Sequence, residues 1–160
     1  MTSTVEAIRD RIIAVIEALT PAADSRVRFR AFRPEAGQDF QDWAEANPTA
    51  ARRRFYVREV GTDQEPPVSD TLAELRTVTF TILVAYPRTS RDGTAQPDSR
   101  DAVIDADRGQ IQDHVGQHGR ENFYPPDHDA TWIGGDYARV DGVLCDFIEI
   151  TQSMTYYLAV

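Results

Sequence analysis

Apolar and polar side chains alternate most regularly between Arg76 and Pro87. Every second position on one side of this stretch is β-branched or aromatic, which predicts a β-strand. These positions are Val78, Phe80, Ile82, Val84 and Tyr86. The other side begins with threonines and ends with Leu83 and Ala85, so we expect that face to be half covered. Pro87 cannot donate a ladder hydrogen bond and should end the strand. The stretch therefore predicts a central strand beneath at least one helix.

Two stretches have helical periodicity. In residues 3–19 an apolar stripe recurs every three or four positions, and Ser3 and Glu6 have the spacing of a capping box. The second helix should run from a cap at Asp98 or Ser99 to Val115. Its aspartates at positions 101, 105 and 107 lie in the first half of the helix, where the helix dipole favours acids.

Arginines follow two further predicted strands, Arg26–Phe32 and Arg52–Val60. If these strands pair, several guanidinium groups share one face of the sheet, and like charges opposite one another are unfavourable. We therefore expect acids of a neighbouring subunit to cover this face. Exposure to solvent and contact with nucleic acid are the alternatives. The interface candidates are Arg26, Arg28, Arg30, Arg54 and Arg58.

The remaining segments complete a single domain that spans residues 1–160. A short helix or structured loop is expected in residues 34–48 after a cap at Asp39. Residues 61–70 have the composition of an exposed connection that could serve as an arm. Its candidate contact residues are Asp63, Glu65, Pro66, Pro67 and Asp70. Residues 120–136 read as irregular, and a long strand should end the sequence.

Asp141-Gly142 predicts a two-residue hairpin turn between flanking strands. Together with this hairpin, the predicted helices and strands indicate a mixed α/β protein, specifically one of the α+β class. Its mainly antiparallel sheet should be packed by the N-terminal helix and by a second helix near residues 98–115.

The charge and composition of the chain argue against several classes of function. The 160 residues carry a net charge of −9, and all of the Lys and Arg positions are arginine. This acidity argues against strong binding to a phosphate backbone. The charge is uneven, since residues 26–58 hold eight arginines against four acids, which suits self-association between unlike surfaces. The single cysteine, Cys145, excludes an internal disulfide. We expect no membrane contact, because no apolar run approaches the length of a membrane span.

No set of residues has the pattern of a catalytic site. His114 and His118 have a spacing that could bind zinc, with Asp127, His128 and Asp129 following, but Gly116 interrupts the helix between them. Cys145 is expected to be an inert, buried thiol. The sequence therefore predicts a protein that is not an enzyme and that needs no cofactor or metal. A small metal-dependent hydrolase is the least favoured alternative.

The order of the elements resembles that of the tail-terminator and neck proteins of long-tailed bacteriophages. The resemblance is one of layout and covers most of the chain, but residues 34–51 and 120–136 do not fit its short form and would be insertions. The segments that carry it are Ile8–Leu19, Arg26–Phe32, Phe55–Val60, Arg76–Pro87, Asp101–Val115 and Ile150–Val160.

The resemblance implies a structural protein of the virion, assembled in the host cytoplasm. Subunits would form a homo-oligomeric ring, a hexamer, at the head-proximal end of the tail tube. The ring would end tube polymerisation and join the tail tube protein to the head–tail connector or stopper protein, with DNA passing through its lumen without sequence-specific binding. Another neck, head-completion or tail-associated assembly protein is the alternative within the same class.

Overall fold

The computed structural model describes residues 4–64, 73–88, 97–115 and 130–159. It has three helices and five strands in these ranges, and the α+β fold predicted from the sequence is confirmed. The elements, in chain order, are α1 (Thr4–Ala18), β1 (Arg30–Ala31), α2 (Phe40–Ala46), β2 (Arg54–Gln64), β3 (Ala73–Pro87), α3 (Pro97–Val115), β4 (Ala130–Asp141) and β5 (Cys145–Ala159). None of the described helices is both long and apolar enough to cross a bilayer.

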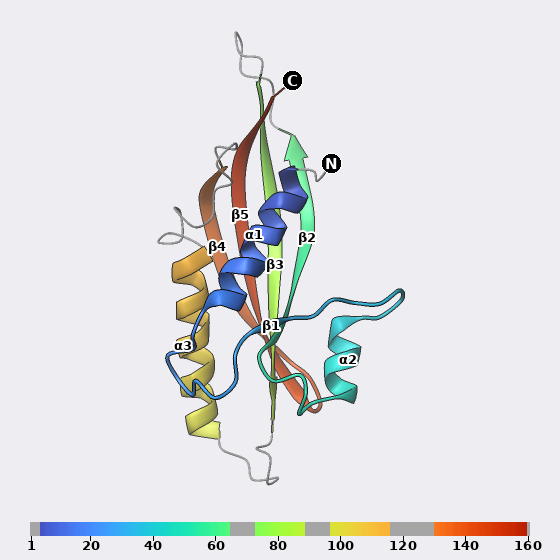
Figure 1. The fold of residues 1–160 in the computed structure, drawn as a ribbon, viewed down its shortest axis with the longest axis vertical. Coiled ribbons are helices and arrows are strands. Elements are labelled where there is room, and N and C mark those ends of the chain that lie inside the picture. Colours follow the sequence, from blue (N-terminus) through green and yellow to red (C-terminus); the bar gives the residue numbers. More distant parts are fainter. Residues whose placement is uncertain (1–3, 65–72, 89–96, 116–129, 160) are drawn as a thin grey trace.

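All five strands belong to one sheet, in the order β1-β2-β3-β5-β4. The short β1 runs parallel to β2, and every other neighbouring pair is antiparallel. β3 is therefore the central strand, as its alternating sequence predicts. β5 lies between β3 and β4, so it pairs along its length with a strand on each side (Figure 1).

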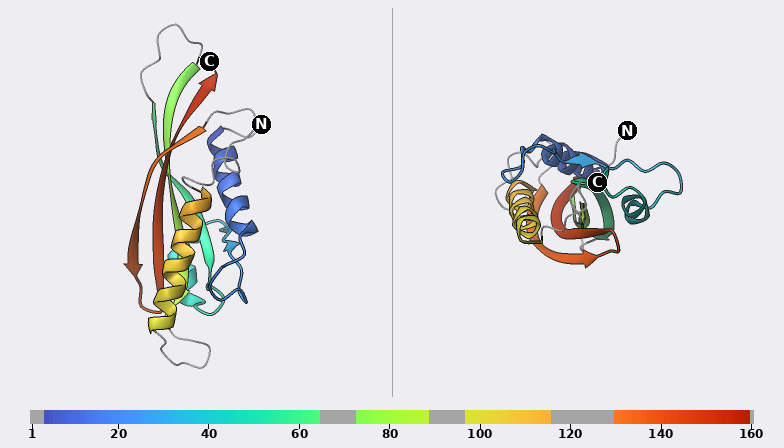
Figure 2. Two further views of the ribbon diagram at one scale, coloured as in Figure 1. Left: turned by 90° about the vertical axis from the view of Figure 1, so that its left-hand side faces the viewer. Right: turned by 90° about the horizontal axis from the view of Figure 1, so that it is seen from below.

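The two faces of the sheet have different covers. On one face, α1 and α3 pack over the inward side of β3, from Val78 to Tyr86, in the larger apolar core (Figures 1 and 2). On the other face, α2 packs only over the end that holds Leu83 and Ala85. The threonine end of that face lies outside this second apolar cluster. The cover expected over Leu83 and Ala85 is confirmed, but it reaches further than predicted, because Thr81 on the same face is also buried.

α2 begins where the sequence predicts. The Asp39 carboxylate accepts a hydrogen bond from the Asp42 backbone N–H and caps the helix. At its other end, the Glu45 carboxylate accepts hydrogen bonds from the backbone N–H groups of Val143, Leu144 and Cys145. Glu45 therefore fastens α2 to the turn between β4 and β5.

The predicted turn at Asp141-Gly142 is wrong by two residues. The Gly142 backbone N–H donates to the Cys145 carbonyl at 2.9 Å, which leaves Val143 and Leu144 as the two central turn residues. The two oxygens of the Glu45 carboxylate accept three hydrogen bonds from this turn. Its tertiary contact therefore outweighs the local preference of Asp-Gly for a type I′ turn.

Three further predictions about strand extent need correction. Of the strand expected over Arg26–Phe32, only Arg30–Ala31 forms. The Val27 carbonyl accepts from the Arg53 side chain, as do the carbonyls of Ala23 and Asp24 before it, and not from a neighbouring strand. β2 continues through Gly61–Gln64, which pairs with β3, so the connection expected at residue 61 begins later. Residues 130–136, expected to be irregular, lie in β4, because β5 supplies hydrogen-bonding partners for them.

Candidate functional site

Three of the five interface candidates share one face of the sheet at its β1/β2 edge. Arg30 of β1 pairs in register with Arg54 of β2, and Arg58 has the same parity as Arg54. This is the face opposite the α1/α3 core, because Phe55 and Val57 point into that core. We call Arg30, Arg54 and Arg58 the arginine face. The shared face predicted from the sequence is thus confirmed for these three residues.

The arginine face lacks a carboxylate partner in the described part of the chain. Arg54 donates to the Ala31 carbonyl at 3.4 Å, and its guanidinium carbon lies 5.5 Å from the centre of the Trp43 ring. Arg30 and Arg58 are exposed, and no hydrogen bond or ion pair joins the side chain of either one to another described residue. The acid expected over this face is therefore not supplied by the described residues of the same subunit.

Arg26 and Arg28 lie away from this face, in the loop between α1 and β1. Arg26 pairs with Asp24 at 2.7 Å, and this hydrogen bond holds the pKa of Asp24 well below its ordinary value. Arg28 donates to the carbonyls of Ala18 and Leu19, where α1 ends. A cation at a helix C-terminus interacts favourably with the helix dipole. Both side chains therefore have a structural role within the subunit.

Both edges of the sheet are open over several residues. β1 pairs with β2 only at Arg54 and Phe55, and among the described strands nothing pairs with β2 beyond that point on its outer side. β4 pairs only with β5 and forms the other edge. Both edge strands also have an irregularity, between Glu59 and Gly61 in β2 and between Trp132 and Gly134 in β4. An open edge presents unpaired backbone groups to a partner strand.

The predicted arm falls mostly outside the described residues. Asp63 lies in β2 and pairs in register with Thr77. It is therefore part of the β2/β3 hairpin and not of a loop. Glu65, Pro66, Pro67 and Asp70 lie outside the described residues.

The most deeply buried charge is one that the sequence analysis missed. The Arg53 side chain is fully buried and donates to both carboxylate oxygens of Asp107, at 2.8 Å and 3.0 Å. It also donates to the backbone carbonyls of Ala23, Asp24 and Val27.

The hydroxyl of Tyr86 donates to the same Asp107 carboxylate at 2.6 Å. Burial raises the pKa of both Tyr86 and Asp107. Parity could have predicted that Arg53 points inward, because it has the same parity as Phe55 and Val57, but not which residue it meets there. The expectation that Asp107 serves the helix dipole is wrong, since its side chain binds Arg53 in the core.

Asp146 is the centre of a second charged cluster. Arg88 and Arg139 contact its carboxylate at 3.0 Å and 3.2 Å, and Arg100 also binds it. Burial acts to raise the pKa of Asp146, but the hydrogen bonds from the arginines outweigh burial and leave the pKa below its ordinary value. The cluster joins the first turn of α3, which holds Arg100, to the end of β3 and to the neighbouring strands β4 and β5. Its geometry is that of a structural ion-pair network.

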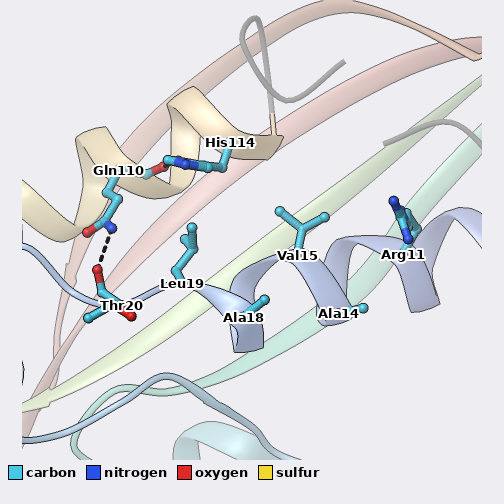
Figure 3. Close-up of a pocket in the computed structure, with 8 residues that line it drawn as sticks. All are labelled: Arg11, Ala14, Val15, Ala18, Leu19, Thr20, Gln110 and His114. Atoms are coloured by element: carbon cyan, nitrogen blue, oxygen red, sulfur yellow. Dashed lines mark hydrogen bonds between the residues drawn. The ribbon is translucent and has the colours of Figure 1, made fainter. Parts of the chain in front are cut away.

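A shallow groove of about 450 Å³ lies between α1 and α3. Figure 3 shows Ala14, Val15 and Ala18 of α1 along one side, with Gln110 and His114 of α3 on the other. The Gln110 amide donates to the Thr20 carbonyl at 2.7 Å, and the His114 ring nitrogen lies 2.8 Å from the Gln110 carbonyl. Among the described residues, the groove lining contains no carboxylate or thiol to act with His114 in catalysis.

The other candidate groups for chemistry are not assembled into a site among the described residues. His118 and Asp127–Asp129 lie outside those residues, and within them no three His, Cys, Asp or Glu side chains are placed to hold a metal. Cys145 is buried, and burial raises the pKa of its thiol to about 11. A thiol of this kind is a poor nucleophile at neutral pH.

The chain matches no known protein-family model, and a search of curated proteins likewise finds no relative.

Proposed function

We propose that the protein is a structural virion subunit of a long-tailed phage. It would form a ring at the head-proximal end of the tail tube, where it ends tube polymerisation and joins the tail to the head connector. The observation that carries this proposal is the arginine face beside an open edge of the sheet, where the exposed side chains of Arg30 and Arg58 have no partner in the described part of the chain.

A ring needs an interface between unlike surfaces, repeated until the rotation per subunit completes a circle. The two open edges offer unlike surfaces, since one is the outer side of β2 beyond Phe55, where β1 no longer pairs with it, and the other is β4. Three successive antiparallel pairings leave β4 antiparallel to β2, so the two edges differ in strand direction. The subunit therefore has different surfaces on its two sides, as a head-to-tail contact requires.

The net charge of −9 supports a lumen through which DNA can slide. A protein that binds DNA tightly neutralises phosphates with many basic side chains and releases their counterions. An acidic subunit lacks this source of affinity. DNA would then be a passing cargo, and the binding partners would be other copies of the chain, the tail tube protein and the connector or stopper protein.

The first experiment is a measurement of mass by light scattering on purified protein, followed by negative-stain images with and without tail tubes. We expect a ring of about six copies, either free or formed on the tube end, together with tubes that no longer lengthen. A stable dimer that never caps tubes would contradict the proposal. Rings that bind the head and leave tube growth unchanged would favour another neck or head-completion protein.

A further inference from the structure

α3 has an acidic outer face on the side away from the core. Asp101, Asp105 and Asp113 are exposed, whereas Ile104, Ile111 and Val115 of the same helix are buried in the larger apolar core. Asp101 pairs with Arg139 at 3.0 Å. Within the described residues, the side chains of Asp105 and Asp113 form no hydrogen bond or ion pair. We call Asp101, Asp105 and Asp113 the acidic face.

This arrangement is unfavourable for α3 on its own. Asp105 follows Asp101 by four residues, and like charges at this spacing destabilise a helix. Asp113 lies in the last turn, where the negative end of the helix dipole disfavours a carboxylate. An external cation would relieve both effects, and the described part of the subunit supplies one only to Asp101.

The arginine face has the same problem with the opposite sign. Arg30 and Arg54 are register partners on adjacent strands, and like charges placed opposite each other are unfavourable. Seen from below, α3 and α2 lie on opposite sides of the molecule (Figure 2, right). Arg54 lies over Trp43 of α2 and so belongs to the side away from α3. The subunit thus carries two complementary charged surfaces on opposite sides.

We propose that the arginine face of one copy docks on the acidic face of α3 in the next copy. The inference rests on the proposed ring and names the surfaces that build it. Opposite charges on opposite sides of one chain produce a contact that repeats head to tail, whereas a two-fold dimer would bring each face against itself. Such complementarity selects the partner and its orientation. The contact should weaken with salt, because the charges on both sides are exposed.

A charge swap tests the contact. Arg30→Glu with Arg58→Glu should weaken self-association at least about tenfold, because it places like charges across the interface. Asp105→Arg with Asp113→Arg should do the same. All four substitutions in one chain should restore association to within about threefold of wild type, since the pairing is regained with reversed sign. Full association of either reversed variant would overturn the inference, and so would a failure of the fourfold variant to recover while it stays folded.

Matched controls change the same charges elsewhere on the surface. Arg33→Glu alters an exposed arginine that follows β1 and pairs with Glu17 at 3.3 Å. Asp10→Arg alters an exposed acid on α1. Both control variants should associate like wild type. An equal loss in the controls would mean that net charge, and not this contact, governs assembly, and would overturn the inference.

Directed cross-linking separates this inference from the proposed function. An Arg58→Cys chain and an Asp105→Cys chain are mixed with a short bis-maleimide, with buried Cys145 giving little background. The mixture should cross-link, and neither chain alone should do so. Rings without this cross-link would overturn the inference and leave the ring standing. Cross-linked chains that never cap tubes would overturn the terminator function and leave the contact standing. Links in either chain alone would show a two-fold contact and overturn the inference.

Discussion

The buried Arg53 network offers the sharpest test of what holds the fold together. Arg53 joins β2 to Asp107 of α3 and to three carbonyls of the loop between α1 and β1. Arg53→Met keeps an unbranched side chain and removes only the guanidinium. It also keeps the positive φ of this residue, 57°, so backbone strain is the same in both proteins. The substitution therefore isolates the contribution of the charged group.

The expected loss follows from what the substitution leaves behind. The Asp107 carboxylate would remain buried with the Tyr86 hydroxyl as its one side-chain donor among the described residues. Breaking a buried ion pair by removing one partner costs about 3–5 kcal/mol, because the other charge stays desolvated. We expect Arg53→Met to lower the free energy of unfolding by that amount. Tyr86→Phe removes a single hydrogen bond to a charged acceptor and should cost about 2 kcal/mol.

Urea unfolding followed by tryptophan fluorescence measures these free energies, with circular dichroism to check that each variant is folded. Arg53→Met combined with Asp107→Leu removes both charges and should cost less than the two single changes added together. An Arg53→Met variant within about 1 kcal/mol of wild type would refute the reasoning. Strict additivity in the double variant would refute it as well.

Three further outcomes can be checked on the same protein. The hydrogen bond from Arg26 lowers the pKa of Asp24 from its ordinary 3.8, so its contribution to stability is present above that pH and is lost as pH falls. Asp24→Asn should therefore be less stable than wild type at neutral pH and should converge with it in an acid titration of unfolding; a constant difference at every pH would contradict this. Gly109→Ala should raise the free energy of unfolding by about 0.5–1 kcal/mol, because Gly109 is inside α3 and an added Cβ meets nothing within 4 Å; a loss on urea unfolding would count against it. Cys145 in the folded protein should react with a thiol reagent at least about 100-fold more slowly than in urea, because burial raises its pKa to about 11; equal rates would show an accessible thiol.

Local patterns predicted the features that short stretches of chain decide. The alternation from Val78 to Tyr86 gave both the place of β3 in the sheet and the side on which α1 and α3 pack. The Asp39 cap gave the start of α2, because the capping bond joins residues three apart. In each case the interaction that forms the element lies within or beside it.

Features that depend on distant partners were missed. Arg53 is buried against Asp107, which lies 54 residues away in the sequence. No pattern in the residues around Arg53 identifies that partner. Glu45 shifts the β4/β5 turn from a distance of 98 residues or more. Gly134 and Gly135 weaken any local strand preference, yet pairing with β5 extends β4 through both. Of the interface candidates, Arg26 and Arg28 resembled the other three because alternation alone cannot reveal a loop.

The place of β5 between β3 and β4 has a consequence for biosynthesis. β4 leaves the ribosome before β5, and its partner in the sheet does not yet exist. Until residues 145–159 emerge, the inner edge of β3 also lacks a neighbour, although β3 carries much of the apolar core. Domains generally fold as units during synthesis, and unpaired strand edges favour aggregation. A chain that lacked β5 would therefore leave an edge of its central strand unpaired, and the sheet is complete only once β5 has been synthesised.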